Sequence, residues 1–176
     1  PNHMFNSSLP HTGKDQKIPS PFVLGYDYYQ GEYQAVENDN MSFQIANGNL
    51  TASMWDLAAW AKRLYTGNAG INSDYVQKMT DTKPISDTSG YGLGCHYIHN
   101  LGFGHTGAVR GYLSLMVYDP ESEIAMVILA NVLNWEDPAG ELVLLRDIGL
   151  FTKRLWDESK PSPTGKNNPK NYSLIQ

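Results

Sequence analysis

Apolar positions change their spacing several times along this chain, and each spacing predicts a different kind of element. From residue 53 to residue 66 they recur every three or four positions, as in a helix with one buried face. These positions are Met54, Leu57, Ala58, Ala61, Leu64 and Tyr65. Ser53 precedes them as an N-cap, and Gly67 follows as the residue that ends the helix. We also predict a short helix over 73–79 and a final helix over about 138–156.

The pattern between the second and third of these helices is typical of β-strands. A glycine-rich strand is expected over 90–97, followed by strands over 103–110, 112–118 and 123–131. Asp-Pro-Glu-Ser at 119–122 forms a tight turn between the last two strands. The last strand is nearly all apolar from Ile124 to Ala130, so we expect it to be covered on both faces.

The N-terminal part of the chain has a weaker pattern. Residues 1–25 are rich in Pro, Ser, Asn and Lys and are predicted to form an irregular arm. Tyr26 to Tyr33 is rich in tyrosine around Gly31, which predicts a short hairpin or an extended excursion of the chain. The order of a helix, a meander of strands and a final helix predicts an α+β fold. Its antiparallel β-sheet would be packed against the C-terminal helix.

Charge and composition narrow the possible functions. The net charge is −5 and the pI is about 5.4, which argues against a nucleic-acid partner because such proteins present a basic face. The apolar run Ile124–Leu133 is far shorter than the roughly 20 residues that a membrane span requires. A single cysteine, Cys95, rules out an intrachain disulfide. The first residues lack the basic and apolar regions of a signal peptide, so the sequence leaves the compartment open.

The candidate site lies in the second predicted strand. Side chains alternate along a strand, so Thr106 and Arg110 should share one face with Ala108, while His105 should take the other. A hydroxyl and a guanidinium on one face suit a carboxylate ligand. Gly107 lets a ligand approach the backbone, which could pair with an extended peptide-like molecule.

An alternative to this carboxylate site is a metal site formed by Cys95, His96, His99 and His105. Thiolate and imidazole ligands suit zinc. On a strand, however, Cys95 and His96 point to opposite faces, so only one of them could easily join a cluster. We therefore predict no metal site.

The ordered motifs of this chain resemble the serine β-lactamase and penicillin-binding-protein superfamily, in particular its class C β-lactamase and DD-peptidase branch. His105-Thr106-Gly107 is similar to the family's third motif, Lys-Thr-Gly or His-Thr-Gly. Residues 47–67 resemble its glycine turn and Asp-Leu-Ala helix, Gly90–Gly94 its Gly-Tyr-Gly-Leu-Gly strand, and residues 104–131 its motif strand with two further strands and an Ala-Asn ending. The resemblance covers roughly residues 40–156.

The resemblance also implies roles for individual residues. Thr106 would bind a substrate carboxylate or carbonyl, and His105 would set the electrostatics around the nucleophile. The backbone N–H of Ala108 would be one of two oxyanion-hole donors. Some DD-peptidase relatives carry an arginine just after the Gly-Tyr-Gly-Leu-Gly strand, where this chain has Cys95-His96, and Arg110 would have to substitute for it. The fold it implies is β-lactamase/transpeptidase-like, with the 53–66 helix in a helical subdomain, and it implies no metal or organic cofactor.

Two motifs of the family are absent from the sequence. None of its serines is followed by lysine three residues later, so the Ser-x-x-Lys nucleophile motif is missing. The only Tyr-x-Ser, Tyr112-Leu113-Ser114, follows the third motif instead of preceding it. We therefore expect residues 1–158 to be the C-terminal portion of a β-lactamase-like domain, followed by a polar tail over 159–176. Alone, this chain is expected to be inactive.

The resemblance implies that the parent protein is a penicillin-recognising serine hydrolase of the DD-peptidase or β-lactamase type. Carboxypeptidase activity is among the activities expected of this type. Its substrates would be β-lactams, D-amino-acid peptides or esters, and its location periplasmic or secreted. The alternatives are an esterase or D-aminopeptidase of the same superfamily, or a non-catalytic binding protein with the same fold. The last apolar strand would pair with the N-terminal half of the domain or, without it, self-associate through its exposed edge.

Overall fold

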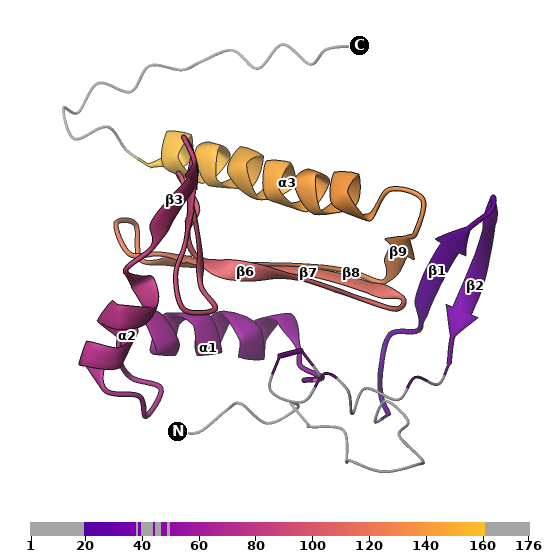
Figure 1. Ribbon diagram of the computed structural model, residues 1–176, viewed down its shortest axis with the longest axis horizontal. Coiled ribbons are helices and arrows are strands. Elements are labelled where there is room, and N and C mark those ends of the chain that lie inside the picture. The colour runs from indigo at the N-terminus through magenta and orange to yellow at the C-terminus, as the bar shows by residue number, and fades with distance from the viewer. Residues whose placement is uncertain (1–19, 38, 40–43, 45–46, 49, 161–176) are drawn as a thin grey trace.

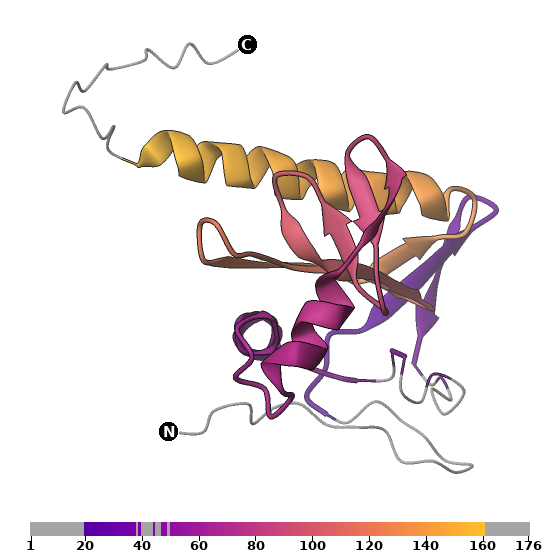
Figure 2. The same ribbon diagram turned by 60° about the vertical axis from the view of Figure 1, so that its left-hand side comes forward.

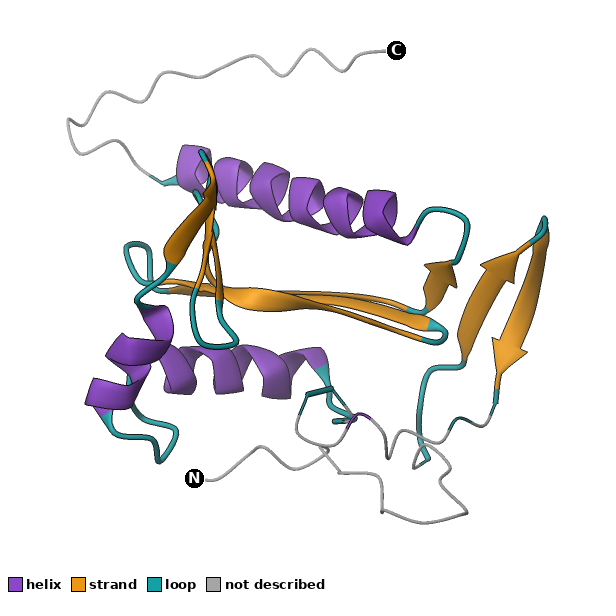
Figure 3. Ribbon diagram, in the orientation of Figure 1, coloured by secondary structure: helices purple, strands orange, loops and turns teal. Residues whose placement is uncertain are grey.

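A computed structural model describes residues 20–37, 39, 44, 47–48 and 50–160 of the chain. Most of the predicted N-terminal arm and nearly all of the predicted tail therefore lie outside the described residues. The described part is a mixed α and β structure with one large sheet, one small sheet and three helices (Figures 1 and 3). The predicted α+β class with an antiparallel sheet and a C-terminal helix is confirmed.

The large sheet is antiparallel, and its six strands lie side by side in sequence order. They are β3 (Lys83–Ser86), β4 (Ser89–Tyr91), β5 (His96–Ile98), β6 (Gly102–Val109), β7 (Tyr112–Asp119) and β8 (Ile124–Ala130). A meander of this kind needs only short turns, because consecutive strands are direct neighbours. Consequently β3 and β8 form its two edges.

The three helices form where the apolar spacing predicts them. They are α1 (Met54–Tyr65), α2 (Ser73–Thr80) and α3 (Pro138–Ser159). Helix α1 begins as expected, since the Asp56 N–H donates to the Ser53 hydroxyl at 3.1 Å. Gly67 follows it with a φ of +73°, a conformation that favours glycine. Helix α3 lies along one face of the large sheet and α1 along the other (Figures 1 and 2).

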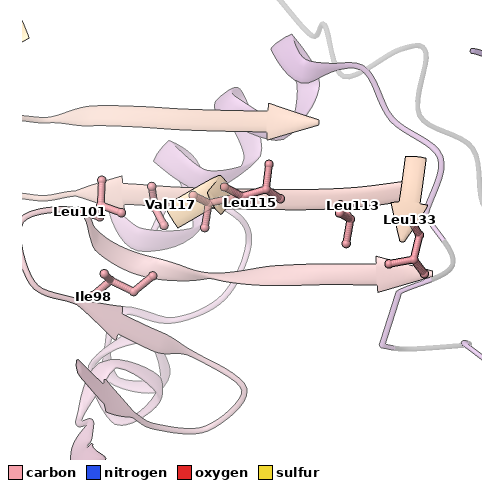
Figure 4. Close-up of a cluster of buried hydrophobic side chains, with 7 residues drawn as sticks. Ile98, Leu101, Leu113, Leu115, Val117 and Leu133 are labelled. Carbon is pink, nitrogen blue, oxygen red and sulfur yellow. The ribbon is translucent and has the colours of Figure 1, made fainter. Parts of the chain in front are cut away.

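The main apolar core lies between the sheet and α3 (Figure 4). Alternate residues of β7 point into it, and the α3 residue Leu145 packs against them. The buried members of this core are Ile98, Leu101, Leu113, Leu115, Val117, Leu133 and Leu145. On the opposite face, Tyr65 of α1 stacks on Tyr118 and Phe103, with ring centroids 6.2 and 6.1 Å apart. The sheet thus forms a middle layer between two helices.

The small sheet contains the predicted tyrosine hairpin. Its strands are β1 (Gly25–Tyr29) and β2 (Glu32–Val36), which pair antiparallel around Gly31. A short strand after β8, β9 (Val132–Asn134), pairs parallel with β1. The small sheet is therefore joined through β9 to the end of the large sheet that carries β8.

The structure corrects one predicted strand. Residues 90–97 do not form a continuous strand, because the chain turns back between β4 and β5. The Gly92 N–H donates to the Cys95 carbonyl at 2.7 Å, and Gly94 has a φ of +63°. Glycines that we interpreted as part of a strand therefore make a turn. The sequence analysis also missed β3 and β9, which are only four and three residues long, too short for a periodic pattern to show.

Strand β8 is contacted by α1 on one face and α3 on the other, in agreement with its apolar sequence. Its residues are nevertheless only half-buried or exposed, and Leu129 is 41% exposed. The reason is its position, because among the described residues no strand pairs with its outer edge.

Candidate functional site

The motif His105-Thr106-Gly107 lies in the second half of β6. On one side β6 pairs with β7 along its length, from Phe103↔Tyr118 to Val109↔Tyr112. On the other side β5 pairs only as far as His96↔Gly104. Within the described part of the chain, the edge of β6 from His105 to Val109 therefore has no strand partner on that side. Backbone groups along such an edge can pair with an extended ligand.

The register of β6 against β7 shows how the motif side chains alternate. Thr106 lies opposite Leu115 and Ala108 opposite Leu113, so both are on the face that carries the main core. His105 lies opposite Met116 and Gly107 opposite Ser114, on the other face. His105 and Ala108 are exposed, while Thr106 and Gly107 are half-buried. The predicted alternation of Thr106 and Ala108 against His105 agrees with this register.

Arg110 lies one residue beyond the end of β6, in the turn to β7. Its Nε donates to Oδ2 of Asp27 in β1 at 2.9 Å, and the next backbone N–H, of Gly111, donates to Oδ1 at 2.8 Å. The Asp27 side chain is 8% exposed and that of Arg110 is 50% exposed. The Arg110 guanidinium therefore already neutralises a carboxylate of its own chain, and an incoming carboxylate would compete with Asp27 for it.

The environment of Asp27 favours its charged form. Burial raises the pKa of this carboxyl, but hydrogen bonds from Arg110, Trp135 and Gly111 outweigh the burial and hold the pKa below its ordinary value. Sequence reasoning did not find Asp27, because it is 83 residues from Arg110 and no local pattern connects the two.

Tyr91, at the end of β4, is a second residue that the sequence analysis missed. Its hydroxyl lies 2.8 Å from Nε2 of His105, and the two rings meet edge to face with centroids 5.6 Å apart. The other ring nitrogen of His105, Nδ1, is bonded to the Thr106 carbonyl. Tyr91 reaches past the start of β5 to the exposed part of β6. Its place in the Gly-Tyr-Gly-Leu-Gly segment was the only available signal.

His96 lies beside this pair, with its ring centroid 5.9 Å from that of Tyr91. Its Nε2 is buried and has no hydrogen-bond partner among the residues that the structure describes. Burial lowers the pKa of His96, and the positive charge of a protonated His105 lowers it further. His96 is therefore held in its neutral form beside the motif.

Cys95 is buried and faces α1, where its Sγ lies 3.6 Å from the Tyr65 hydroxyl. Burial raises the pKa of the Cys95 thiol, so it is not an activated nucleophile. Among the described side chains, no group of three or more His, Cys, Asp or Glu residues is arranged to hold a metal ion.

Two depressions of the described surface lie away from the motif. One, of about 770 Å³, runs along α3, where charged side chains such as Asp147 and Arg154 meet Asn100. The other, of about 180 Å³, lies beside β3 and β4. Neither is lined by His105, Thr106 or Gly107. The motif is therefore part of neither depression, and the feature that distinguishes it is the unpaired edge of β6.

The sequence and the fold were compared with known proteins. The Beta-lactamase family model matches residues 6–150. No curated protein matches the chain. The structure is similar to D-amino acid amidase from Ochrobactrum anthropi SV3 complexed with L-phenylalanine amide, with a TM-score of 0.70 and 19% identity. That match covers 89% of this chain and 48% of the amidase.

Two further solved structures share the fold. D-stereospecific amidohydrolase from Streptomyces sp. matches with a TM-score of 0.62 and 24% identity, over 72% of this chain and 39% of the other. A penicillin binding protein from Bacillus halodurans matches with a TM-score of 0.58 and 18% identity, over 73% of this chain and 41% of the other. The chain therefore spans less than half the length of each of these three proteins.

Together the family match and the fold define a member of the serine β-lactamase and penicillin-binding-protein superfamily. The chain belongs to the Beta-lactamase family. Its fold is therefore β-lactamase-like. In the described residues, no helix is both long enough and apolar enough to cross a membrane.

Proposed function

We propose that this chain forms one wall of the active site of a penicillin-recognising serine hydrolase of the DD-peptidase or β-lactamase type. The observation that carries the proposal is the unpaired edge of β6 from His105 to Val109, which displays the His-Thr-Gly motif. An extended amide or β-lactam substrate would pair with this edge as an added strand. Thr106 would bind the substrate carboxylate or carbonyl, and Gly107 would allow its close approach.

The chemistry is acyl transfer. A serine hydroxyl would attack the substrate carbonyl, lose its proton to a nearby base and form an ester with the acyl group, while the amine leaves with a proton. Water would then cleave this ester and restore the serine. The backbone N–H of Ala108 would stabilise the negative oxygen of each tetrahedral intermediate. Loss of such a donor typically costs about 3 to 4 kcal/mol in the transition state.

The nucleophile would come from a polypeptide segment that is not in this chain. The sequence contains no Ser-x-x-Lys, and the motif lies on an open edge in the described structure. Both observations support a site whose other wall, with serine and base, belongs to the N-terminal half of the same domain. The part of the three similar structures that this chain does not match is long enough to supply it.

The surface near β8 supports the same proposal. Strand β8 is an apolar edge with no charge and no proline, the kind of edge that natural proteins cover. Above it, three α3 residues on one helix face are 41% to 57% exposed: Leu144, Ile148 and Leu155. A strand paired with β8 and a helix beside α3 would cover both surfaces.

A second candidate function is amide hydrolysis by a D-aminopeptidase or D-amino-acid amidase, with an esterase as a further member of this group. Arg110 is the cation expected to bind a terminal carboxylate, but it already forms an ion pair with Asp27. A substrate without a free carboxylate avoids that competition. Two of the similar structures, a D-amino acid amidase and a D-stereospecific amidohydrolase, agree with this candidate. A non-catalytic binding protein remains the third outcome of the test.

The test is labelling by fluorescent penicillin. This chain alone should not be labelled, whereas the chain combined with the N-terminal half of its domain should be labelled on that half. In the combined protein, Thr106→Val should reduce labelling about tenfold or more, because a hydrogen bond to a charged group is worth roughly 1.5–3 kcal/mol. Thr88→Val, in the β3–β4 turn, is the matched control and should leave labelling unchanged. Labelling of the lone chain would contradict the missing nucleophile.

The remaining outcomes separate the candidate functions. A combined protein that cleaves D-amino-acid amides but takes no penicillin would favour the amidase. A correctly assembled domain that does neither would favour a binding protein.

A further inference from the structure

Tyr91 and His105 form a hydrogen-bonded pair at the exposed end of the motif. The Tyr91 hydroxyl is 2.8 Å from Nε2 of His105, while Nδ1 of His105 is bonded to the Thr106 carbonyl. A carbonyl oxygen can only accept a hydrogen bond, so Nδ1 must carry the proton. In the neutral imidazole Nε2 is then unprotonated and accepts from the Tyr91 hydroxyl. The two contacts together select one tautomer and one ring orientation.

We infer that Tyr91 is a positioning residue for His105. The catalytic role of this pair rests on the proposed function, whereas its geometry does not. Tyr91 holds the imidazole against the motif strand in the Nδ1–H form, with Nε2 directed at the phenol. No residue of the described chain besides Tyr91 bonds Nε2 of His105. The His105 ring, next to Thr106 in β6, therefore has Nδ1 as its hydrogen-bond donor and Nε2 as its acceptor.

The tyrosine hydroxyl has a property that suits this role. It can donate to a neutral Nε2, and it can accept from the Nε2–H of a protonated imidazole. The phenol can therefore hold the His105 ring in place through Nε2 while Nδ1 donates to the Thr106 carbonyl.

Several features separate this role from simple packing. Tyr91 is 40% exposed and His105 is also exposed, so the bond between them contributes little to folding. His96 lies beside the Tyr91 ring, but its pKa is lowered by burial and by His105, so it adds no competing positive charge. The pair lies where β5 ends and the free edge of β6 begins, the edge proposed to bind substrate.

The inference can be tested on this chain as it exists by long-range 15N–1H NMR of its histidine rings. At about pH 8 an unperturbed imidazole is neutral, and the His105 nitrogen shifts should be those of the Nδ1–H tautomer. Tyr91→Phe removes the donor to Nε2 and should move the Nε2 shift toward that of a nitrogen without a hydrogen bond, while Tyr75→Phe, in α2 and 64% exposed, should leave the His105 shifts unchanged. Circular dichroism of each variant checks that the fold is kept.

An Nε2–H tautomer at His105 in the unaltered chain would overturn the inference, and this measurement requires no variant. Unchanged His105 shifts in a folded Tyr91→Phe variant would also overturn it. In the combined domain, Tyr91→Phe should lower kcat with little change in KM and should alter the pH profile. A failed penicillin-labelling experiment contradicts the proposed function alone, because the NMR result does not depend on the nucleophile.

Discussion

Asp27 in β1 accepts a hydrogen bond from Arg110 at 2.9 Å, although 83 residues separate them in sequence. The same carboxylate accepts the Gly111 N–H at 2.8 Å. One buried side chain therefore fixes the turn between β6 and β7 to the small sheet. Because the motif lies only a few residues before this turn, the contact also helps to hold the motif strand.

Removal of the Asp27 carboxylate should destabilise the fold. We expect Asp27→Ala to lower the free energy of unfolding by about 1–3 kcal/mol, since it leaves the Gly111 N–H and the Arg110 guanidinium without their acceptor. Urea denaturation followed by circular dichroism measures the change. Asp81→Ala is the matched control, because its ion pair with Lys83 is exposed and such pairs contribute about 0–1 kcal/mol. Equal losses in the two variants would contradict the structural role of Asp27.

Acid should weaken the fold through two carboxylates. Burial raises the pKa of Asp119, but hydrogen bonds from Ser122, Lys153 and the Glu121 N–H outweigh it and lower the pKa below 3.8; Asp27 is shifted in the same direction. A lowered folded-state pKa gives stability that is present above the unfolded value and is lost as the pH falls through the folded value.

The urea midpoint should therefore change little between about pH 7 and pH 5 and fall steeply below about pH 4. Asp119→Asn should reduce both the stability at neutral pH and the steepness of this acid loss. Its partner Lys153, bonded to Asp119 at 3.2 Å and Asp157 at 2.6 Å, has a raised pKa. Lys153 thus stabilises the fold below its raised pKa for as long as its carboxylate partners are charged, so its contribution is lost in acid together with theirs and again at strongly alkaline pH. If the stability of Asp119→Asn fell as steeply in acid as that of the unaltered chain, Asp119 would not be a source of the acid sensitivity.

A methyl group at Gly104 should disturb the motif strand. The added Cβ would lie 1.9 Å from the Met116 carbonyl oxygen and 2.7 Å from the Val117 Cα, both backbone atoms of β7. Gly104→Ala should therefore lower the free energy of unfolding by about 1–3 kcal/mol or more, as overpacking does. In contrast, Gly48→Ala meets its nearest atom at 3.8 Å and should change stability by less than about 0.5 kcal/mol. Thermal unfolding compares the two, and similar values would contradict the close approach of β6 and β7.

In the absence of a covering segment, this chain should self-associate through β8 and α3. Light scattering at increasing concentration should detect species larger than a monomer. Leu129→Lys and Ile148→Lys should reduce the association, because each adds a charge to the exposed apolar surface. Leu93→Lys, 71% exposed in the β4–β5 turn, should not. A monodisperse monomer at all concentrations would count against this prediction.

Elements with a strong local signal were predictable from the sequence. Helix α1 has both a periodic stripe and the Ser53 cap, and the motif strand ends within one residue of its predicted end. The break at Gly92–Gly94 was missed because glycine is compatible with a strand next to a close neighbour and with a turn. The partners of Arg110 and His105 were also missed, since Asp27 and Tyr91 reach them only through the tertiary fold.

The parallel pairing of β1 with β9 has a consequence for how the chain assembles. Strands β6 to β8 join neighbours in sequence and can form early, but β1 must close a long loop, and the Gln30 N–H meets Glu136 across 106 residues. The tyrosine hairpin should therefore dock late and open first. Its amide protons should exchange with solvent faster than those of β7, which would reveal a hierarchy of local opening within this compact scaffold.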